Sequence, residues 1–353
     1  MSDFYLVKTD ANGNLMWNKT YGGTADDFGR SVVQTSDGGY AIVGTMTSAA
    51  TSYDVWLVKT DANGNMQWNK TYGGTDLDNG DSVVQANDGG YVIAGDTSSV
   101  LSLPDAYLIR TDASGNMLWN KTYGGASSDY GNDVTRTIDG GYAISGNTWS
   151  FGAGWYDMWL IKTDSNGNAL WNKTYGGPDL ETGNSVIQTS DGGYAIGGIT
   201  ASAGQGGNDA FLVKTDSNGN MQWNNTYGGP KNDYGYSLIQ TSDEGYAIVG
   251  MTCDYTVLYQ DMWLIKTSAN GNMQWTKTYG GINYDVGMSI IQTGDGGYIV
   301  AGNKGADAWL IKVAVEGESG LVQTDSTSNS ITLYRGANDV YWNYVRIRIW
   351  KID

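Results

Sequence analysis

The sequence contains no histidine and a single cysteine, Cys253, among its 353 residues. Without histidine, the chain lacks the base of Ser-His-Asp and Cys-His catalysis and the commonest ligand of transition metals. One cysteine cannot form an intrachain disulfide, so stability must come from a packed core, which a chain of this length can bury. The composition therefore excludes histidine-based catalysis and a fold held together by disulfides.

Basic residues and long apolar runs are also scarce. The chain has 20 Lys and Arg against 37 Asp and Glu, which gives a net charge of −17 at pH 7. Because the acidic residues are spread along the chain, binding to nucleic acid or anionic lipid is disfavoured, and a neutral or cationic partner is expected. No segment of the given sequence is typical of a signal peptide, although a leader could have been removed, and no apolar run reaches about eighteen residues, so we expect no membrane insertion.

What the chain does contain is a repeat. Tryptophan recurs every 51 or 52 residues in the phrase WNKTYGG or a close variant, at Trp17, Trp68, Trp119, Trp171, Trp223 and Trp275. A second phrase, DGGY or DEGY, recurs in phase and ends at Tyr40, Tyr91, Tyr142, Tyr194, Tyr246 and Tyr298. A third, an aspartate followed by an apolar stretch, starts at Asp3, Asp54, Asp105, Asp157, Asp209, Asp261 and Asp307. This period predicts an array of similar structural units.

Each unit is predicted to hold four short strands, named A to D in chain order. In one unit they are Ser31–Thr35, Tyr40–Thr45, Val55–Thr60 and Met66–Tyr72. Ser-Asp-Gly-Gly joins A to B and Asp-Ala-Asn-Gly-Asn joins C to D, and their Gly and Asn residues suit tight hairpins. Helix-period stretches are absent. Four strands in about 52 residues favour a β-propeller over a solenoid.

We therefore predict an all-β protein, a single domain of residues 1–353 folded as a β-propeller of four-stranded antiparallel blades. The chain starts at a strand C, so its first C and D pair lacks strands A and B. Residues 331–350 can supply two strands, which predicts seven blades, closed by pairing of the N- and C-terminal strands of residues 1–23 and 326–353. The alternative is six blades, with residues 307–353 outside the ring.

The phrases SDGGYAIVG, DVWLVKTDANGN and WNKTYGG resemble the β-propeller repeats of many prokaryotic, especially archaeal, secreted and surface proteins. The resemblance covers nearly the whole chain and implies a propeller located at the cell surface or outside the cell. Asp61–Trp68 is also similar to the tryptophan-docking repeat of quinoprotein propellers and to the sialidase Asp-box. In those families the motif packs a turn against a tryptophan, which implies that Trp68 and its counterparts lock blades together.

An acidic residue two positions before a glycine recurs between strands D and A, at Asp27, Asp78, Asp129, Glu181, Asp233 and Asp285. Since calcium prefers oxygen ligands, a ring of these carboxylates could hold it at one mouth of the central channel. Alternatively, each carboxylate accepts backbone N–H groups of its own loop, and the recurrence in every unit favours this structural role. We expect no other cofactor.

The units differ most in their B-to-C loops, and this difference points to the working surface. These loops carry aromatic residues that a connector does not need, including Trp149, Phe151, Trp155, Tyr156, Tyr255 and Tyr259. Aromatic side chains of this kind stack on sugars or anchor protein partners. The alternative is that the loops fold inward and bury them.

Strand A also opens with a residue that differs between units, and the first two are Arg30 and Asp81. With the neighbouring carboxylates they could form an acid–base site, since paired carboxylates hydrolyse glycosides. Our prediction is a monomeric, non-catalytic binding or scaffold module for a glycan or a protein. The alternatives are a glycan-processing enzyme and a self-assembling structural subunit.

Five units contain an Asn-x-Thr sequon, at Asn18, Asn69, Asn120, Asn172 and Asn224. If a glycosylating cell exports the protein, one glycan per blade is expected. Duplication of the WNKT phrase explains the same pattern without glycosylation.

Overall fold

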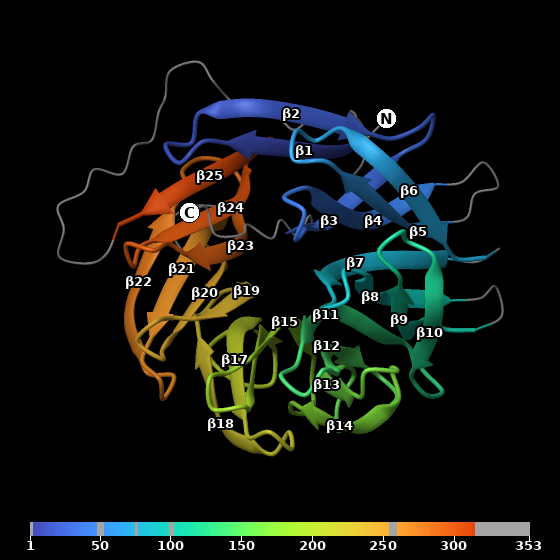
Figure 1. The fold of residues 1–353 in the computed structure, drawn as a ribbon. Helices are drawn as coiled ribbons and strands as arrows, with labels where there is room; N and C mark the ends of the chain where they lie inside the picture. Colours follow the sequence, from blue (N-terminus) through green and yellow to red (C-terminus); the bar gives the residue numbers. More distant parts are fainter. Residues whose placement is uncertain (1–2, 48–52, 75–76, 99–101, 254–259, 315–353) are drawn as a thin grey trace. The chain divides into compact units, whose positions relative to one another are not determined.

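The computed structural model describes residues 3–47, 53–74, 77–98, 102–253 and 260–314, which form 25 strands (Figure 1). These ranges contain no helix of a length and hydrophobicity that could cross a bilayer. The strands belong to two compact units, one ending at Thr174 and the other beginning at Tyr175.

The first unit holds a two-stranded hairpin and three four-stranded antiparallel sheets. The hairpin pairs β1 (Phe4–Thr9) with β2 (Leu15–Tyr21). The sheets run in the order A-B-C-D: β3 (Asp27–Gln34), β4 (Tyr40–Thr47), β5 (Tyr53–Thr60) and β6 (Met66–Tyr72); β7 (Leu77–Gln85), β8 (Tyr91–Ser98), β9 (Asp105–Thr111) and β10 (Met117–Tyr123); β11 (Asp129–Arg136), β12 (Tyr142–Thr148), β13 (Asp157–Thr163) and β14 (Ala169–Tyr175).

The second unit holds two four-stranded sheets and one three-stranded sheet. They are β15 (Glu181–Gln188), β16 (Tyr194–Thr200), β17 (Asp209–Thr215) and β18 (Met221–Tyr227); β19 (Asp233–Gln240), β20 (Tyr246–Cys253), β21 (Gln260–Thr267) and β22 (Met273–Tyr279); β23 (Asp285–Gln292), β24 (Tyr298–Lys304) and β25 (Asp307–Val313).

Consecutive four-stranded antiparallel sheets, each made by one repeat, are propeller blades, so the chain is an all-β propeller. The predicted number of blades is wrong. We expected seven four-stranded blades, whereas the described residues form five four-stranded sheets, one of three strands and one of two. The number of repeated sequence phrases gives the number of strand pairs. It does not tell which of these pairs belong to the same sheet. Residues 326–353, to which we assigned the remaining strands, lie outside the described residues.

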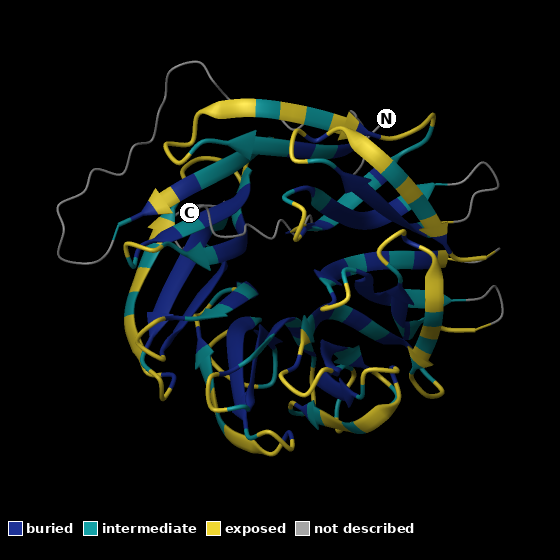
Figure 2. Cartoon of the chain, viewed as in Figure 1, coloured by how far each residue is buried: buried dark blue, intermediate teal, exposed yellow. Residues whose placement is uncertain are grey.

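Burial explains why each strand has its composition. Strands B and C are buried on both faces, as in β16 and β17, and their sequences are rich in Val, Ile, Leu and aromatic residues. Strand D alternates between exposed and less exposed residues, as Figure 2 shows for β6, β10 and β18. The WNKT phrase therefore presents one polar face to solvent.

Tryptophan on strand D packs against the following sheet, as Trp223 of β18 shows. The Trp223 ring lies 5.8 Å from the ring of Tyr246, in an edge-on arrangement. It also packs on Gly271, which has a φ of +74° and where a Cβ atom would lie 2.5 Å from the Trp223 ring. The hydroxyl of Tyr227 donates to the Gly271 carbonyl oxygen at 2.6 Å. The same tyrosine bond recurs at 2.6 or 2.7 Å from Tyr21, Tyr72, Tyr123 and Tyr175 to Gly64, Gly115, Gly167 and Gly219.

Tyr227→Phe is expected to lower the free energy of unfolding by about 1–2 kcal/mol, because it leaves the Gly271 carbonyl oxygen without this donor. Urea unfolding of the purified protein measures the change. Tyr53→Phe is the matched control, since Tyr53 is exposed at the start of β5. Equal loss in both variants would show that the inter-blade bond adds no stability.

Candidate functional site

The B-to-C loop between β12 and β13 carries the largest aromatic group and is fixed at both ends. At its start, Oδ1 of the buried Asp129 accepts the hydroxyl of Thr148, and Oδ2 accepts the hydroxyl of Ser150 at 2.6 Å. At its end, Oδ2 of Asp157 accepts the N–H groups of Ala153 and Gly154 at 2.9 and 3.0 Å. The loop is therefore pre-organised by two carboxylates.

This loop displays aromatic side chains to solvent. Trp149 is 50% exposed, Trp155 is 72% exposed and Phe151 is 41% exposed. The Tyr156 ring lies 5.6 Å from the Trp149 ring and 6.2 Å from that of Tyr130 on β11. Trp149, Phe151, Trp155, Tyr156 and Tyr130 are called the aromatic platform below.

The sequence prediction of this group was incomplete. It did not include Tyr130, which is the second residue of strand A and comes from a different segment of the repeat. This position differs between repeats, for example Phe28, Asn79 and Tyr130, and this difference was the available signal. Tyr255 and Tyr259, the predicted members from a later B-to-C loop, lie outside the described residues.

The recurrent carboxylates begin strand A, whereas the sequence placed them in the preceding loop. Most accept the N–H of the glycine four residues earlier, at 2.7–3.1 Å: Asp27, Asp78, Asp129, Glu181 and Asp233. The sixth, Asp285, accepts the N–H of Gly305 at 3.0 Å. These bonds tie the D-to-A loop to the strand it precedes, which is the role expected of a turn-capping carboxylate.

Calcium at these carboxylates stays a prediction. In the described part of the chain, no three acidic or cysteine side chains gather closely enough to hold a metal ion. Each of these carboxylates belongs to a different repeat.

Four of these carboxylates have a second carboxylate beside them. A Cβ atom at Gly228 would lie 1.8 Å from Oδ1 of Asp209 and 2.7 Å from Oδ2 of Asp233, so both face this glycine. Burial raises the pKa of Asp209 to about 6, and the charge of Asp233 adds to the rise. The same pairing is found for Asp54 with Asp78, Asp105 with Asp129, and Asp261 with Asp285.

Arg30 and Asp81 occupy an unusual backbone position. The register between strands A and B shifts at a bulge, and Arg30 and Asp81 are two of the extra residues in the first unit. A bulge re-aims the side chain of the extra residue. The Nε atom of Arg30 lies 3.7 Å from Oδ1 of Asp81, so the two predicted residues do meet.

The same cluster contains Asp96 of β8, which the sequence analysis missed. Burial, and then the charge of Asp81, raise the pKa of the Asp96 carboxyl. Asn79 donates to Oδ2 of Asp96 at 3.0 Å. The equivalent residue differs between repeats, for example Thr45 and Ile199, and this difference was the available signal.

The second unit has an apolar group at the equivalent positions. Tyr236 and Met288 are two of the bulge residues there, and they pack with Ile199 and Met251. The rings of Tyr234 and Tyr236 are stacked at 6.1 Å. The bulge positions thus carry Arg30, Asp81 and Asn132 in the first unit, and Asn184, Tyr236 and Met288 in the second.

The sequon asparagines are exposed on the described D strands. Two of them have a structural role, because Asn69 and Asn172 accept the indole N–H of Trp56 and Trp159 at 3.3 Å. Glycosylation of the sequons stays untested.

No protein-family model matches the chain. Over 175 residues it is 26% identical to the regulatory protein FlaEY of Caulobacter vibrioides, a match that covers 41% of this chain and 18% of that protein. The chain therefore matches less than a fifth of this curated relative's length.

Solved structures with a similar chain path include three propellers of low sequence identity. A glucose dehydrogenase gives a TM-score of 0.49 at 10% identity, over 82% of this chain and 98% of that one. The Pan2 WD40 domain of Neurospora crassa gives 0.49 at 11% identity, over 82% and 81%. Sqt1 of Chaetomium thermophilum gives 0.47 at 11% identity, over 81% and 68%. Likenesses of this size say nothing about a ligand or an activity.

Proposed function

We propose that the protein is a non-catalytic binding module that acts at the cell surface or outside the cell and recognises a glycan through the aromatic platform. The observation that carries the proposal is the exposure of Trp149 and Trp155 on a loop held by two carboxylates. Large rings left in water have no folding role to explain them, and flat aromatic faces match the apolar faces of sugar rings. A rigid loop lowers the ordering cost of binding.

Charge narrows the class of glycan. The chain carries a net charge of −17, and Asp129 and Asp157 lie beneath the platform loop. An anionic polysaccharide or nucleic acid would be repelled, so the favoured ligand is neutral or cationic. A monomer suffices for this role, because the described platform comes from one sheet.

The test is a glycan-array assay on the intact protein, followed by calorimetry with the best ligand. We expect Trp149→Ala and Trp155→Ala to weaken binding by about 2 kcal/mol each, or roughly 30-fold, as for other central aromatic contacts. Their unfolding transitions are expected to stay close to that of the parent, because both rings are exposed. Leu118→Ala is the control, since Leu118 is 57% exposed on β10.

Repeating the assay with calcium and with a chelator tests the carboxylates. Calcium-dependent binding would assign a metal to Asp129 or its counterparts. If no glycan binds under either condition, the glycan proposal is wrong, and a protein partner or self-assembly becomes the leading function.

A second candidate is supported by the Arg30, Asp81 and Asp96 cluster. Two carboxyls beside one guanidinium, one of them with a raised pKa, can divide the roles of acid and base. Release of reducing sugar from array ligands, lost in Asp81→Asn, would favour a glycan-processing enzyme. Binding without product release would favour the binding module.

A further inference from the structure

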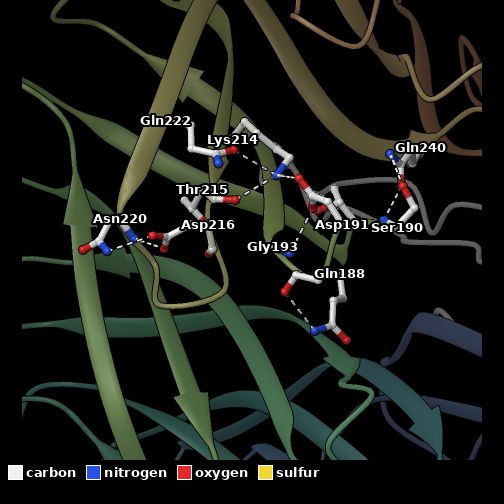
Figure 3. Close-up of polar contacts among 12 residues, drawn as sticks. Gln188, Ser190, Asp191, Gly193, Lys214, Thr215, Asp216, Asn220, Gln222 and Gln240 are labelled. Atoms are coloured by element: carbon white, nitrogen blue, oxygen red, sulfur yellow. Dashed lines mark hydrogen bonds and ion pairs between the residues drawn. The ribbon is translucent and has the colours of Figure 1, made fainter.

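Several A-to-B turns share an ion pair between a buried lysine and an aspartate that is about half exposed, shown for the β15–β18 sheet in Figure 3. Lys214 is buried, and its Nζ atom contacts Oδ2 of Asp191 and the carbonyl of Thr215, both at 2.8 Å. Asp191 also accepts the N–H of Gly193 at 3.0 Å. The same lysine–aspartate pair recurs in Lys59–Asp37, Lys162–Asp139 and Lys266–Asp243.

A glutamine closes the junction between three of these turns and the following sheet. Oε1 of Gln240 accepts the N–H of Ser190 at 2.8 Å, and its Nε2 donates to the Ser190 hydroxyl at 3.3 Å (Figure 3). The bond to the serine N–H has the same length at two other junctions, Ser36–Gln85 and Ser242–Gln292. These junctions add no net charge.

The junction between the β7–β10 and β11–β14 sheets departs from this pattern. Asn87 stands where three of the other turns have serine, Arg136 where the other repeats have glutamine, and Arg110 where they have lysine. Nη2 of Arg110 contacts both carboxylate oxygens of Asp88 at 2.5 Å. Nη1 of Arg136 donates to Oδ1 of Asn87 at 2.5 Å. The ion pair is retained, and one cation has been added.

These substitutions accompany a hollow of about 500 Å³. Its lining includes Arg136, Ile138 and Tyr142 together with Arg110 and Asn87. Ile138 is 92% exposed at the rim, where a connecting turn gains nothing from an isoleucine. The hollow therefore combines a guanidinium with an apolar wall.

Local charge selects the ligand. Arg110 is neutralised by Asp88, and Lys162 neutralises Asp139. No carboxylate of the described residues forms a salt bridge with Arg136, and only one of its five N–H donors is used by Asn87. The planar guanidinium of an arginine can donate two parallel hydrogen bonds to one carboxylate. Arg136 therefore gives this hollow one excess positive charge, although the chain has a net charge of −17. This local charge can attract an anionic ligand.

We propose that this hollow binds a small carboxylate ligand, either a sugar acid or the carboxylate of an amino acid, with Arg136 as its anchor and Ile138 and Tyr142 as its apolar wall. The site lies among the A-to-B turns, at the opposite end of the strands from the aromatic platform. It does not depend on the glycan proposed to bind there.

The test is an NMR titration of the intact protein with glucuronate and N-acetylaspartate, and with glucose as the uncharged comparison. Saturable shifts are expected with a Kd of about 1 mM or tighter, typical of a small ligand held by one strong contact. Saturation by glucuronate alone identifies a sugar acid, and saturation by N-acetylaspartate alone identifies an amino-acid carboxylate. Glucose is expected to cause no saturable shift.

Arg136→Gln restores the residue used at the other junctions, so the fold is expected to persist. It should weaken carboxylate binding at least tenfold, the effect of losing a charge-assisted hydrogen bond. Lys173→Gln removes the same charge from an exposed position on β14 and should leave binding unchanged. Equal affinity in Arg136→Gln and the parent, or no saturable shift with either carboxylate, would overturn the proposal.

Discussion

Gly250→Ala is expected to destabilise the protein by about 3 kcal/mol or more, because overpacking against rigid backbone is at the costly end of core substitutions. A Cβ atom at Gly250 would lie 1.7 Å from the carbonyl oxygen of Tyr234 and 2.7 Å from its carbonyl carbon. Both atoms belong to the backbone of the paired strand β19, so no rotamer change relieves the clash.

The bulge explains why this position requires glycine. The register of β19 and β20 shifts between Gly235 and Ser237, and Gly250 lies opposite Gly235 at that shift. The same close approach, 1.7–1.9 Å to a backbone oxygen of strand A, occurs at Gly44, Gly95, Gly146 and Gly302. The last glycine of the phrase YAIVG is therefore a steric requirement of the bulge.

Urea unfolding, or the yield of folded protein if the variant is too unstable, measures this effect. Gly229→Ala is the matched control, because a Cβ atom there has no neighbour within 4 Å. A Gly250→Ala variant that unfolds at the urea concentration of the parent would refute the steric account of the bulge.

The second large effect is a stability maximum in mildly acidic solution, near pH 4. Two groups of aspartates with opposite pKa shifts produce it. On the acid side, burial alone would raise the pKa of Asp191, but bonds from Lys214 and Thr189 outweigh burial and lower it to about 2. Asp37 and Asp139 behave in the same way. Since their folded pKa lies below the unfolded value of about 3.9, their stabilisation is present above that value and is lost as the pH falls toward 2.

Near neutral pH, the paired carboxylates have the opposite effect on stability, because their pKa values are raised and not lowered. The folded pKa of Asp209 is raised to about 6, so its protonated form is favoured by folding. The resulting stabilisation is complete below the unfolded pKa of about 3.9 and is lost as the pH rises through about 6. A difference of about 2 between the folded and unfolded pKa corresponds to about 3 kcal/mol in the free energy of unfolding. The pKa values of Asp27, Asp54, Asp105 and Asp285 are raised too, which adds to the loss.

Calorimetric Tm values between pH 3 and pH 8 test this profile. Asp209→Asn removes one charge of a pair while keeping the shape of the side chain, so it should raise stability at pH 7.5 and flatten the fall above pH 4. Asp179→Asn makes the same charge change at an exposed position and is the control. A Tm that increases steadily from pH 4 to pH 7 would contradict the assignment of protonated pairs.

The repeat, the strand order and the turns could be predicted from the sequence, because they depend on residues close together in the chain. The B and D strands β4 and β6 begin at the predicted Tyr40 and Met66, since glycine and asparagine turns mark their starts. Strand A was predicted too short. β3 begins at Asp27, because bulges such as the one at Arg30 interrupt the apolar alternation that marks a strand.

The rest depends on residues far apart in the sequence. Asp209 and Asp233 belong to different strands and meet at Gly228, so neither residue alone indicates a pair. Arg136 and Asn87 are 49 positions apart, so neither residue alone indicates that the two meet. The blade count failed for the same reason, because it depends on which strand pairs share a sheet.

The tyrosine bonds between neighbouring repeats also determine how the protein opens. Tyr21 reaches only the turn of the following repeat, and Tyr72 only the one after it. Within a unit, each repeat is therefore coupled only to its neighbours in the sequence. Amide hydrogens of the β1–β2 hairpin, which has no A and B strands in the described chain, should exchange before those of β4 and β5, with fraying that advances one repeat at a time.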